Sequence, residues 1–315
     1  MRSLGSWLLF PLTFTALGAL GHLAVGCSAS GTSDGGPNGG GSGATSGSGA
    51  SGGTAGTAGG GFGGTGGDLL GDGGDTTPTG QVYGHSPDTL YEVEPYSKTV
   101  TVVGRFNCLG GGEMWDIAVD AKGKMLGSVS TGFGTGMLVD IDPKTASCTH
   151  VANGDFPNSL GYIPVGALDP DVEALVGYNV AQYLRIRPDT GEIFPIGNLN
   201  PNPTGQNWVS SGDVVSVQGG KTYLTVHLQF GSDTNDSLAE IDPKTGKVVR
   251  IIGQTGYPQL YGLGYWANTA YGFSATGVLI SIDLDTGAGT PIPLPSIPSG
   301  LSFYGAGTTT SAPIR

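Results

Sequence analysis

Five stretches decide the fold of this chain: LYEVEPYSK from Leu90, LVDIDPKTA from Leu138, LRIRPDTGE from Leu184, LAEIDPKTG from Leu238 and LISIDLDTG from Leu279. Each begins as an alternating apolar and polar run and then reaches an acidic or proline-containing turn. The anchor leucines lie 48, 46, 54 and 41 residues apart. A strand-like repeat of roughly 40–50 residues is typical of a β-propeller or a related array.

Each phrase extends upstream into two more strand-like runs joined by a polar turn. The upstream segments are IAVDAKGKMLGSVS from Ile117, GALDPDVEALVGYN from Gly166, VVSVQGGKTYLTVH from Val214 and GLGYWANTAYGFS from Gly262. Short polar turns between such runs predict β-hairpins. A complete unit is therefore a four-stranded antiparallel sheet, with strands A to D, and its small-residue A strand suits the crowded centre of a propeller.

The first unit lacks an A strand, because VYGHSPDTL from Val82 aligns with a B strand. The segment FYGAGTTTS, Phe303–Ser311, can supply it from the other end of the chain. The sequence thus predicts an all-β, five-bladed β-propeller, closed by pairing of the C-terminal strand with the N-terminal blade. Six or seven blades would require a repeat hidden in a long loop. The predicted blades are Gln81–Phe106 with Gly300–Arg315, Met114–Gly154, Tyr162–Gly197, Trp208–Gly253 and Gly256–Leu294.

The repeat phrase resembles that of the WD40-like and YncE-like β-propellers, and the resemblance covers 81–315. A GH…WD signature in each blade is missing, so a true WD40 protein is not expected. This fold hosts many activities, so the resemblance implies architecture and leaves function open.

The N-terminal residues read as export and anchoring signals. Residues 1–26 carry an early charge, an apolar run and small residues before Cys27, as in a signal peptide. The ending Ala-Val-Gly-Cys resembles the bacterial lipobox, which implies cleavage before Cys27 and lipidation of that residue. A plain signal peptide or a membrane-spanning anchor is the alternative. Ser28 after the cysteine favours the outer membrane of a bacterial cell envelope.

Residues 27–80 are mostly Gly, Ser, Thr and Ala, which predicts a disordered tether between the lipid and the propeller at 81–315. The net charge is −12, with 13 Lys and Arg against 25 Asp and Glu. An acidic chain without a basic stripe is not expected to bind nucleic acid. The membrane, through the lipid, is an expected partner, and the protein is expected to be a monomer.

Cys108 and Cys148 remain as a pair in an oxidising compartment, which invites a disulfide. The repeat register argues against it. Cys108 falls in a connection on one face of the propeller, and Cys148 follows a turn on the opposite face. Four or five strand residues of about 3.3 Å each separate those levels, whereas a disulfide needs Cα atoms within about 7 Å. The register therefore predicts that the two cysteines are unpaired.

Loop lengths differ between the two faces. The A–B and C–D turns are short, whereas the B–C loops and the connections between blades share the other face and several are long. Because binding residues concentrate on long loops held by a rigid scaffold, this face is the predicted binding surface. Its candidate residues are Trp115, Asp116, Phe133, Phe156, Trp208, Phe230, Tyr257 and Tyr261. The alternative is that these aromatic side chains fill the gaps between wedge-shaped blades.

Enzyme signatures are missing from the sequence. It contains no HExxH, C-x-x-C-H, G-x-S-x-G or P-loop pattern, so no catalytic residue, metal or cofactor is predicted. The leading hypothesis is a non-enzymatic binding module for a protein, peptide or glycan. Two alternatives remain open: a polysaccharide hydrolase or lyase using Glu113, Asp116 and Asp155, and a structural spacer without a ligand.

Overall fold

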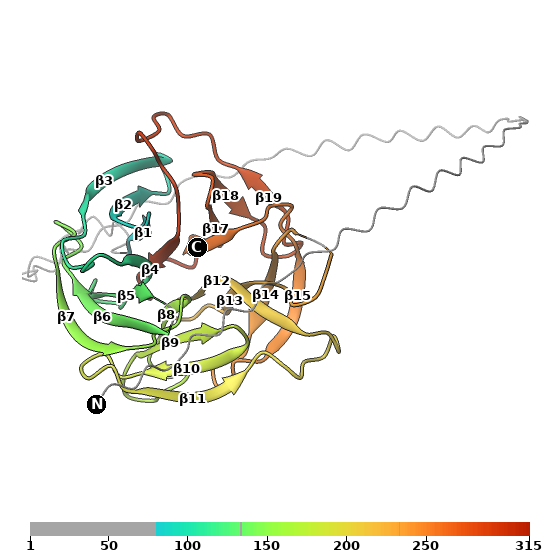
Figure 1. Cartoon of the computed structure of the whole chain (residues 1–315). Helices are drawn as coiled ribbons and strands as arrows, with labels where there is room; N and C mark the ends of the chain where they lie inside the picture. Colours follow the sequence, from blue (N-terminus) through green and yellow to red (C-terminus); the bar gives the residue numbers. More distant parts are fainter. Residues whose placement is uncertain (1–79, 133, 233) are drawn as a thin grey trace, which may run out of the picture. The chain divides into compact units, whose positions relative to one another are not determined.

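A computed structural model describes residues 80–132, 134–232 and 234–315. In these residues, twenty strands form five four-stranded antiparallel sheets, and the five sheets surround a common centre (Figure 1). The predicted five-bladed, all-β propeller is therefore confirmed. The predicted signal peptide, the lipidated Cys27 and the tether lie outside the described residues.

The blades, written from the innermost strand outward, follow the predicted units. Blade 1 contains β20 (Gly305–Thr308), β1 (Val82–His85), β2 (Thr89–Glu94) and β3 (Thr99–Arg105). Blade 2 contains β4 (Glu113–Val119), β5 (Met125–Gly132), β6 (Thr135–Ile141) and β7 (Cys148–Gly154). Blade 3 contains β8 (Leu160–Ile163), β9 (Ala174–Asn179), β10 (Gln182–Ile186) and β11 (Ile193–Asn198). Blade 4 contains β12 (Trp208–Ser216), β13 (Thr222–Leu228), β14 (Ser237–Ile241) and β15 (Val248–Gln254). Blade 5 contains β16 (Leu260–Trp266), β17 (Thr269–Ser274), β18 (Leu279–Ile282) and β19 (Gly289–Pro291).

The ring closes through the split blade. Strand β20 pairs antiparallel with β1, from Val82 opposite Thr308 to His85 opposite Gly305. The predicted pairing of the C-terminal strand with the N-terminal blade is confirmed. It matters because an unpaired β1 would expose a row of backbone N–H and C=O groups.

The apolar cores lie between neighbouring blades. One core joins Leu126 and Leu138 of blade 2 to Leu175 and Ile186 of blade 3. Alternate residues of each strand face opposite sides of the blade. Each blade therefore packs against both of its neighbours in the ring. The cores fix the blades against one another and position the loops at both ends of the ring.

The repeat phrase also takes part in a contact between neighbouring blades. Opposite the anchor leucine, the outermost strand of blades 1 to 4 (β3, β7, β11 and β15) carries a β-bulge. The residue opposite lies at the end of the outermost strand and packs against the C–D turn of the next blade. An added Cβ at Gly104, Gly197 or Gly253 would overlap the carbonyl oxygen of Thr145, Thr245 or Thr286, respectively. These close approaches explain the glycines, because only a residue without a side chain fits.

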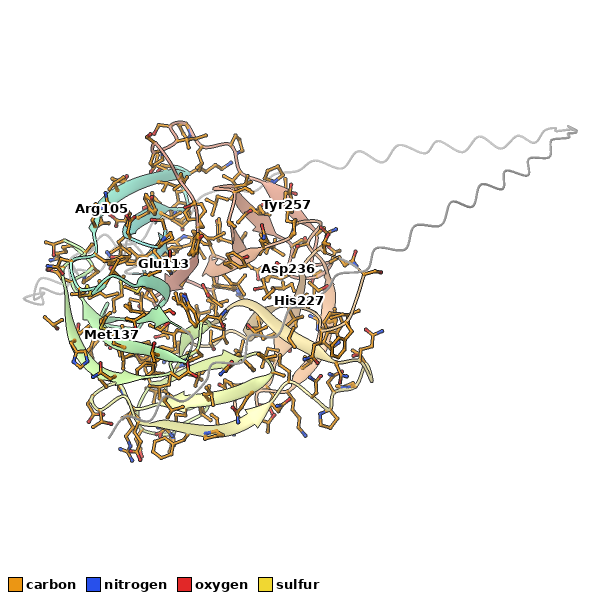
Figure 2. The ribbon with its side chains drawn as sticks, viewed as in Figure 1. Arg105, Glu113, Met137, His227, Asp236 and Tyr257 are labelled. Carbon is orange, nitrogen blue, oxygen red and sulfur yellow. A yellow bond between two sulfur atoms is a disulfide. The ribbon has the colours of Figure 1, made fainter. Side chains whose placement is uncertain are left out.

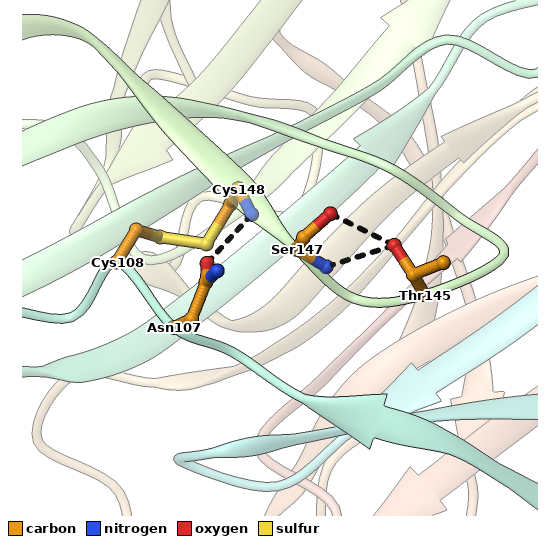
Figure 3. The surroundings of a disulfide bond; sticks show 5 residues. All are labelled: Asn107, Cys108, Thr145, Ser147 and Cys148. Carbon is orange, nitrogen blue, oxygen red and sulfur yellow. Dashed lines mark hydrogen bonds between the residues drawn. A yellow bond between two sulfur atoms is a disulfide. The ribbon is translucent and has the colours of Figure 1, made fainter.

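The same contact corrects the prediction for the cysteines. Cys108 and Cys148 form a disulfide, with their Cα atoms 5.5 Å apart (Figure 3). The backbone N–H of Cys148 also donates a hydrogen bond to the side chain of Asn107, at 2.9 Å. The prediction of unpaired cysteines was wrong because it treated the strands as parallel to the channel axis. Successive strands rotate by about 20–25°, so the end of β3 swings sideways to the C–D turn of blade 2.

Blade 3 departs from the expected short A–B turn, because residues 164–173 separate β8 from β9. The described chain begins on this short-turn face of the ring, where Gly80 contacts Ala312 and Trp266. The last residues of the chain therefore lie there as well. The long loops emerge from the opposite face, called here the long-loop face.

Candidate functional site

Three of the five innermost strands carry a bulge near the long-loop face. The register shifts between Met114 and Asp116 in β4, between Ser210 and Val214 in β12, and between Leu260 and Gly262 in β16. A bulge redirects the side chains next to it. Here two of the redirected side chains are carboxyls, Asp116 and Asp213, and both are fully enclosed at the centre of the ring.

Asp116 bonds to the backbone of its own strand and of the next blade. Its Oδ1 accepts a hydrogen bond from the N–H of Ile117 at 2.7 Å. Its Oδ2 accepts one from the N–H of Leu160, the first residue of β8. Asp116 therefore joins blade 2 to blade 3, and its exposure of 0% leaves no surface for a soluble ligand.

Asp213 forms the corresponding contacts on the other side of the ring. Its Oδ2 accepts hydrogen bonds from the N–H of Ala306 at 2.6 Å and of Leu263 at 3.2 Å. These donors belong to β20 and β16, so Asp213 joins blade 4 to blades 1 and 5. Together, Asp116 and Asp213 contact the backbones of β4, β8, β16 and β20, and Asp213 itself belongs to β12.

His85, at the end of β1, completes the central cluster. Its Nδ1–H donates to the carbonyl of Ser86 at 2.9 Å, which leaves Nε2 as an acceptor 3.9 Å from Oδ1 of Asp116. Burial lowers the pKa of His85 to about 4, against the weaker effect of the Ser86 carbonyl, so the imidazole is neutral near pH 7. Gly305 makes this approach possible, because a Cβ there would overlap both Nε2 and Oδ1.

Burial also raises the pKa of the two central carboxyls well above the usual range of an aspartic acid. The charge of Asp213 raises the pKa of Asp116 further, since two carboxylates at close range repel. Backbone N–H donors act in the opposite direction on both groups.

A small cavity lies among the innermost strands at the centre of the ring. The cavity has a volume of about 10 Å³ and is lined by backbone and side chains of the innermost strands, among them Val119, Tyr162 and Val215. That volume is close to the minimum that one water molecule requires.

A third buried carboxyl, Asp236, lies on the long-loop face of blade 4. It accepts a hydrogen bond from the N–H of Leu260 at 2.7 Å, and its Oδ1 is 3.9 Å from Nδ1 of the partly exposed His227. Burial raises the pKa of Asp236. The backbone N–H of Asp236 donates to the carbonyl of Tyr257 at 2.9 Å, so these three labelled residues gather where blades 4 and 5 meet (Figure 2).

The predicted aromatic residues divide into packed and exposed members. Phe156 is buried, and Trp208 is 8% exposed with its Nε1–H donating to Thr204 at 2.8 Å. Trp115, Tyr257 and Tyr261 are half-buried, and Phe133 lies outside the described residues.

Phe230 is 87% exposed on the loop between β13 and β14. Tyr304, which sequence reasoning missed, packs edge-to-face with Tyr261 and is 37% exposed. Tyr304 lies next to the closing strand and outside every repeat phrase, so only the ring closure brings it to this face.

A cavity of about 510 Å³ opens on the long-loop face of blade 1. Its lining includes Tyr91, the ion pair of Arg105 with Asp88, and Glu113. Glu113 opens β4 near the middle of the ring, and its side chain is exposed (Figure 2). A larger cavity, of about 870 Å³, lies at the short-turn end of blade 3, where Arg187 stacks on Phe194.

The described residues contain neither a cluster of metal ligands nor a membrane-spanning helix. No group of three or more His, Cys, Asp or Glu side chains is arranged to hold a metal ion there. No helix long and apolar enough to cross a bilayer occurs in that part of the chain.

Comparisons with known proteins support no assignment beyond the fold. No protein-family model and no curated protein matches the chain. Among solved structures, a protein of unknown function from Bacteroides caccae is similar at 14% identity and a TM-score of 0.37, over 73% of this chain and 98% of that one.

Two further structures are similar at the same level. A protein of unknown function from Bacteroides thetaiotaomicron aligns at 14% identity and a TM-score of 0.43, over 70% of this chain and 61% of that one. A protein provisionally assigned as a 6-phosphogluconolactonase, from Bacteroides uniformis, aligns at 13% identity and a TM-score of 0.32, over 68% and 66%. These values carry no activity over to this chain.

Proposed function

We propose that this chain is a lipid-anchored binding module of the bacterial cell envelope, related to the YncE-like propellers, that holds a protein, peptide or glycan on its long-loop face. The observation that carries the proposal is the exposure of Phe230 and Tyr304 on that face, where Tyr304 packs against the half-buried Tyr261. Aromatic side chains supply large contact area at binding surfaces.

The position of the chain ends favours the same face. The described chain begins at Gly80 on the short-turn face. In this proposal the tether joins the propeller at the end opposite the long loops, so its attachment point covers none of them. The Cys108–Cys148 disulfide supports export, because disulfides persist in oxidising compartments such as the periplasm and the cell surface.

The enclosure of Asp116 removes one of the three acids that the hydrolase alternative could use. A glycoside hydrolase needs two carboxyls that both reach the substrate. Asp116 is enclosed and accepts two backbone hydrogen bonds, whereas Glu113 and Asp155 are exposed. The three predicted acids therefore differ in accessibility.

The experiment compares binding by matched surface variants. Purified wild-type protein and the Phe230→Ala/Tyr304→Ala variant are tested against envelope proteins, peptidoglycan and a glycan array. The control variant, Tyr96→Ala/Val172→Ala, removes residues that are 65% and 52% exposed on the short-turn half. We expect at least a roughly tenfold loss of affinity in the first variant alone.

Equal binding by both variants, or no binding by the wild type, would reject the proposal and favour a structural spacer.

The lipid anchor is tested in a separate experiment. Cys27→Ser is expected to abolish incorporation of labelled fatty acid and to release the protein from the membrane fraction. A variant that stays membrane-bound would show that the apolar N-terminal segment is itself the anchor.

A further inference from the structure

The central carboxyls lack one hydrogen-bond donor. Asp116 receives the N–H groups of Ile117 and Leu160, and Oδ2 of Asp213 receives those of Leu263 and Ala306. Oδ1 of Asp213 receives none from any N–H or hydroxyl group, although it is fully buried. A buried acceptor without a donor loses the hydration it has in water and is costly.

The neighbours of this oxygen leave few possible donors. His85 is excluded, because its single N–H is committed to Ser86 and its Nε2 is also an acceptor without a partner. The side chain that Asp213 faces is the carboxyl of Asp116. A carboxylic acid can donate one hydrogen bond, whereas a carboxylate can only accept.

We propose that Asp116 and Asp213 share one proton in the native protein, and that the resulting acid–carboxylate hydrogen bond ties blade 2 to blade 4 across the centre of the ring. Blades 2 and 4 are not neighbours in the ring. The shared proton therefore links strands that the blade-to-blade cores do not bring together. Through Ala306, the same pair also holds the closing strand β20.

The charges around the pair agree with this assignment. Burial and the charge of Asp213 raise the pKa of Asp116, and burial raises that of Asp213. From the surrounding strands, β1 contributes His85, while β8, β16 and β20 contribute backbone N–H groups only. No cation among the described residues is available to neutralise a doubly charged pair at this position.

The proposal makes native stability depend on pH in a defined direction. Because the pKa of the pair is higher in the native than in the unfolded state, the native protein binds more protons. Stability is then lost as the pH rises through the native pKa. His85 acts oppositely: its pKa is lowered to about 4, so its contribution is complete above its unfolded value of about 6.5 and is lost as the pH falls toward 4. Above that unfolded value His85 no longer changes the stability with pH.

The test follows the thermal midpoint of the full chain between about pH 6.5 and 9, where ordinary Asp, Glu, Lys and Tyr groups do not titrate. The third buried acid, Asp236, would add its own dependence of the thermal midpoint on pH. All variants are therefore made in the Asp236→Asn background. We expect the midpoint to fall with rising pH in that background and to be flat after Asp116→Asn. The Glu113→Gln variant, which changes an exposed residue of the same strand, should keep the fall of the thermal midpoint with rising pH. A flat midpoint before Asp116→Asn, or an unchanged slope after it, would overturn the proposal.

A second measurement needs no substitution at the pair. The infrared C=O stretching band of a protonated carboxyl should persist at about pH 8 in the Asp236→Asn protein, well above the usual aspartate pKa. Unfolding at that pH should release about one proton, measured by calorimetry in buffers of different ionisation enthalpy. The absence of the band and of proton release would overturn the proposal even if Asp116→Asn does not fold.

Discussion

Single residues at the centre of the ring show how the backbone sets the chemistry of a side chain. Asp116 and Asp213 differ from exposed acids such as Asp155 only in their surroundings, because bulges in β4 and β12 turn them inward. Gly305 is equally specific, since it leaves the space in which His85 approaches Asp116. A glycine at this position is a packing requirement and not a turn.

Gly305→Ala tests this requirement. The added methyl group would overlap Nε2 of His85 and Oδ1 of Asp116, and both of these side chains are fully buried. We expect a loss of about 1–3 kcal/mol in the free energy of unfolding, as for overpacked cores, measured by chemical denaturation. Ala306→Gly, at the next position of the same strand, is the control for backbone effects. Wild-type stability of Gly305→Ala would contradict the close packing described here.

At the scale of elements, the contact between the outermost strand of one blade and the C–D turn of the next recurs around the ring. Gly104, Gly197 and Gly253 meet a threonine carbonyl of the following turn. Between blades 2 and 3 the roles are exchanged, since Ala152 lies where a Cβ on Gly191 would be. The disulfide adds a covalent link to the first of these contacts.

Removal of the disulfide by Cys108→Ser/Cys148→Ser should destabilise the protein. The bridge spans 40 residues of sequence, and loss of such a constraint on the unfolded chain corresponds to about 4 kcal/mol in the chain-entropy model. Urea denaturation with and without reductant measures the effect. Reductant should lower the stability of the wild type and leave the double variant unchanged. Equal wild-type stability in both conditions would show that the bridge contributes nothing.

For the whole molecule, closure depends on a strand of four residues at the far end of the sequence. Strand β20 pairs with β1, and its Ala306 bonds to Asp213. Because closure removes the free edges, it protects every blade and not blade 1 alone.

Truncation after Gly300 should therefore remove the strand that pairs with the inner edge of β1. It should also remove the hydrogen bond that the N–H of Ala306 donates to Oδ2 of Asp213. We expect aggregation, measured by light scattering, or loss of the cooperative thermal transition, measured by far-UV circular dichroism. Addition of a synthetic peptide of residues 301–315 should restore part of the transition, and a scrambled peptide should not. A soluble truncated monomer with an unchanged midpoint would contradict the role given to closure.

The sequence by itself determined the blade count, the strand order and the split blade, because these follow from local periodicity and from turns whose signals lie within a few residues. It also identified the long-loop face and the exposed Phe230 on it, but not Tyr304. Tertiary structure alone decided the disulfide, the burial of Asp116 and Asp213, and the place of Tyr304. Each of these depends on the twist of the blades, on bulges one or two residues long, or on closure between distant parts of the chain, and local patterning carries no signal for any of them.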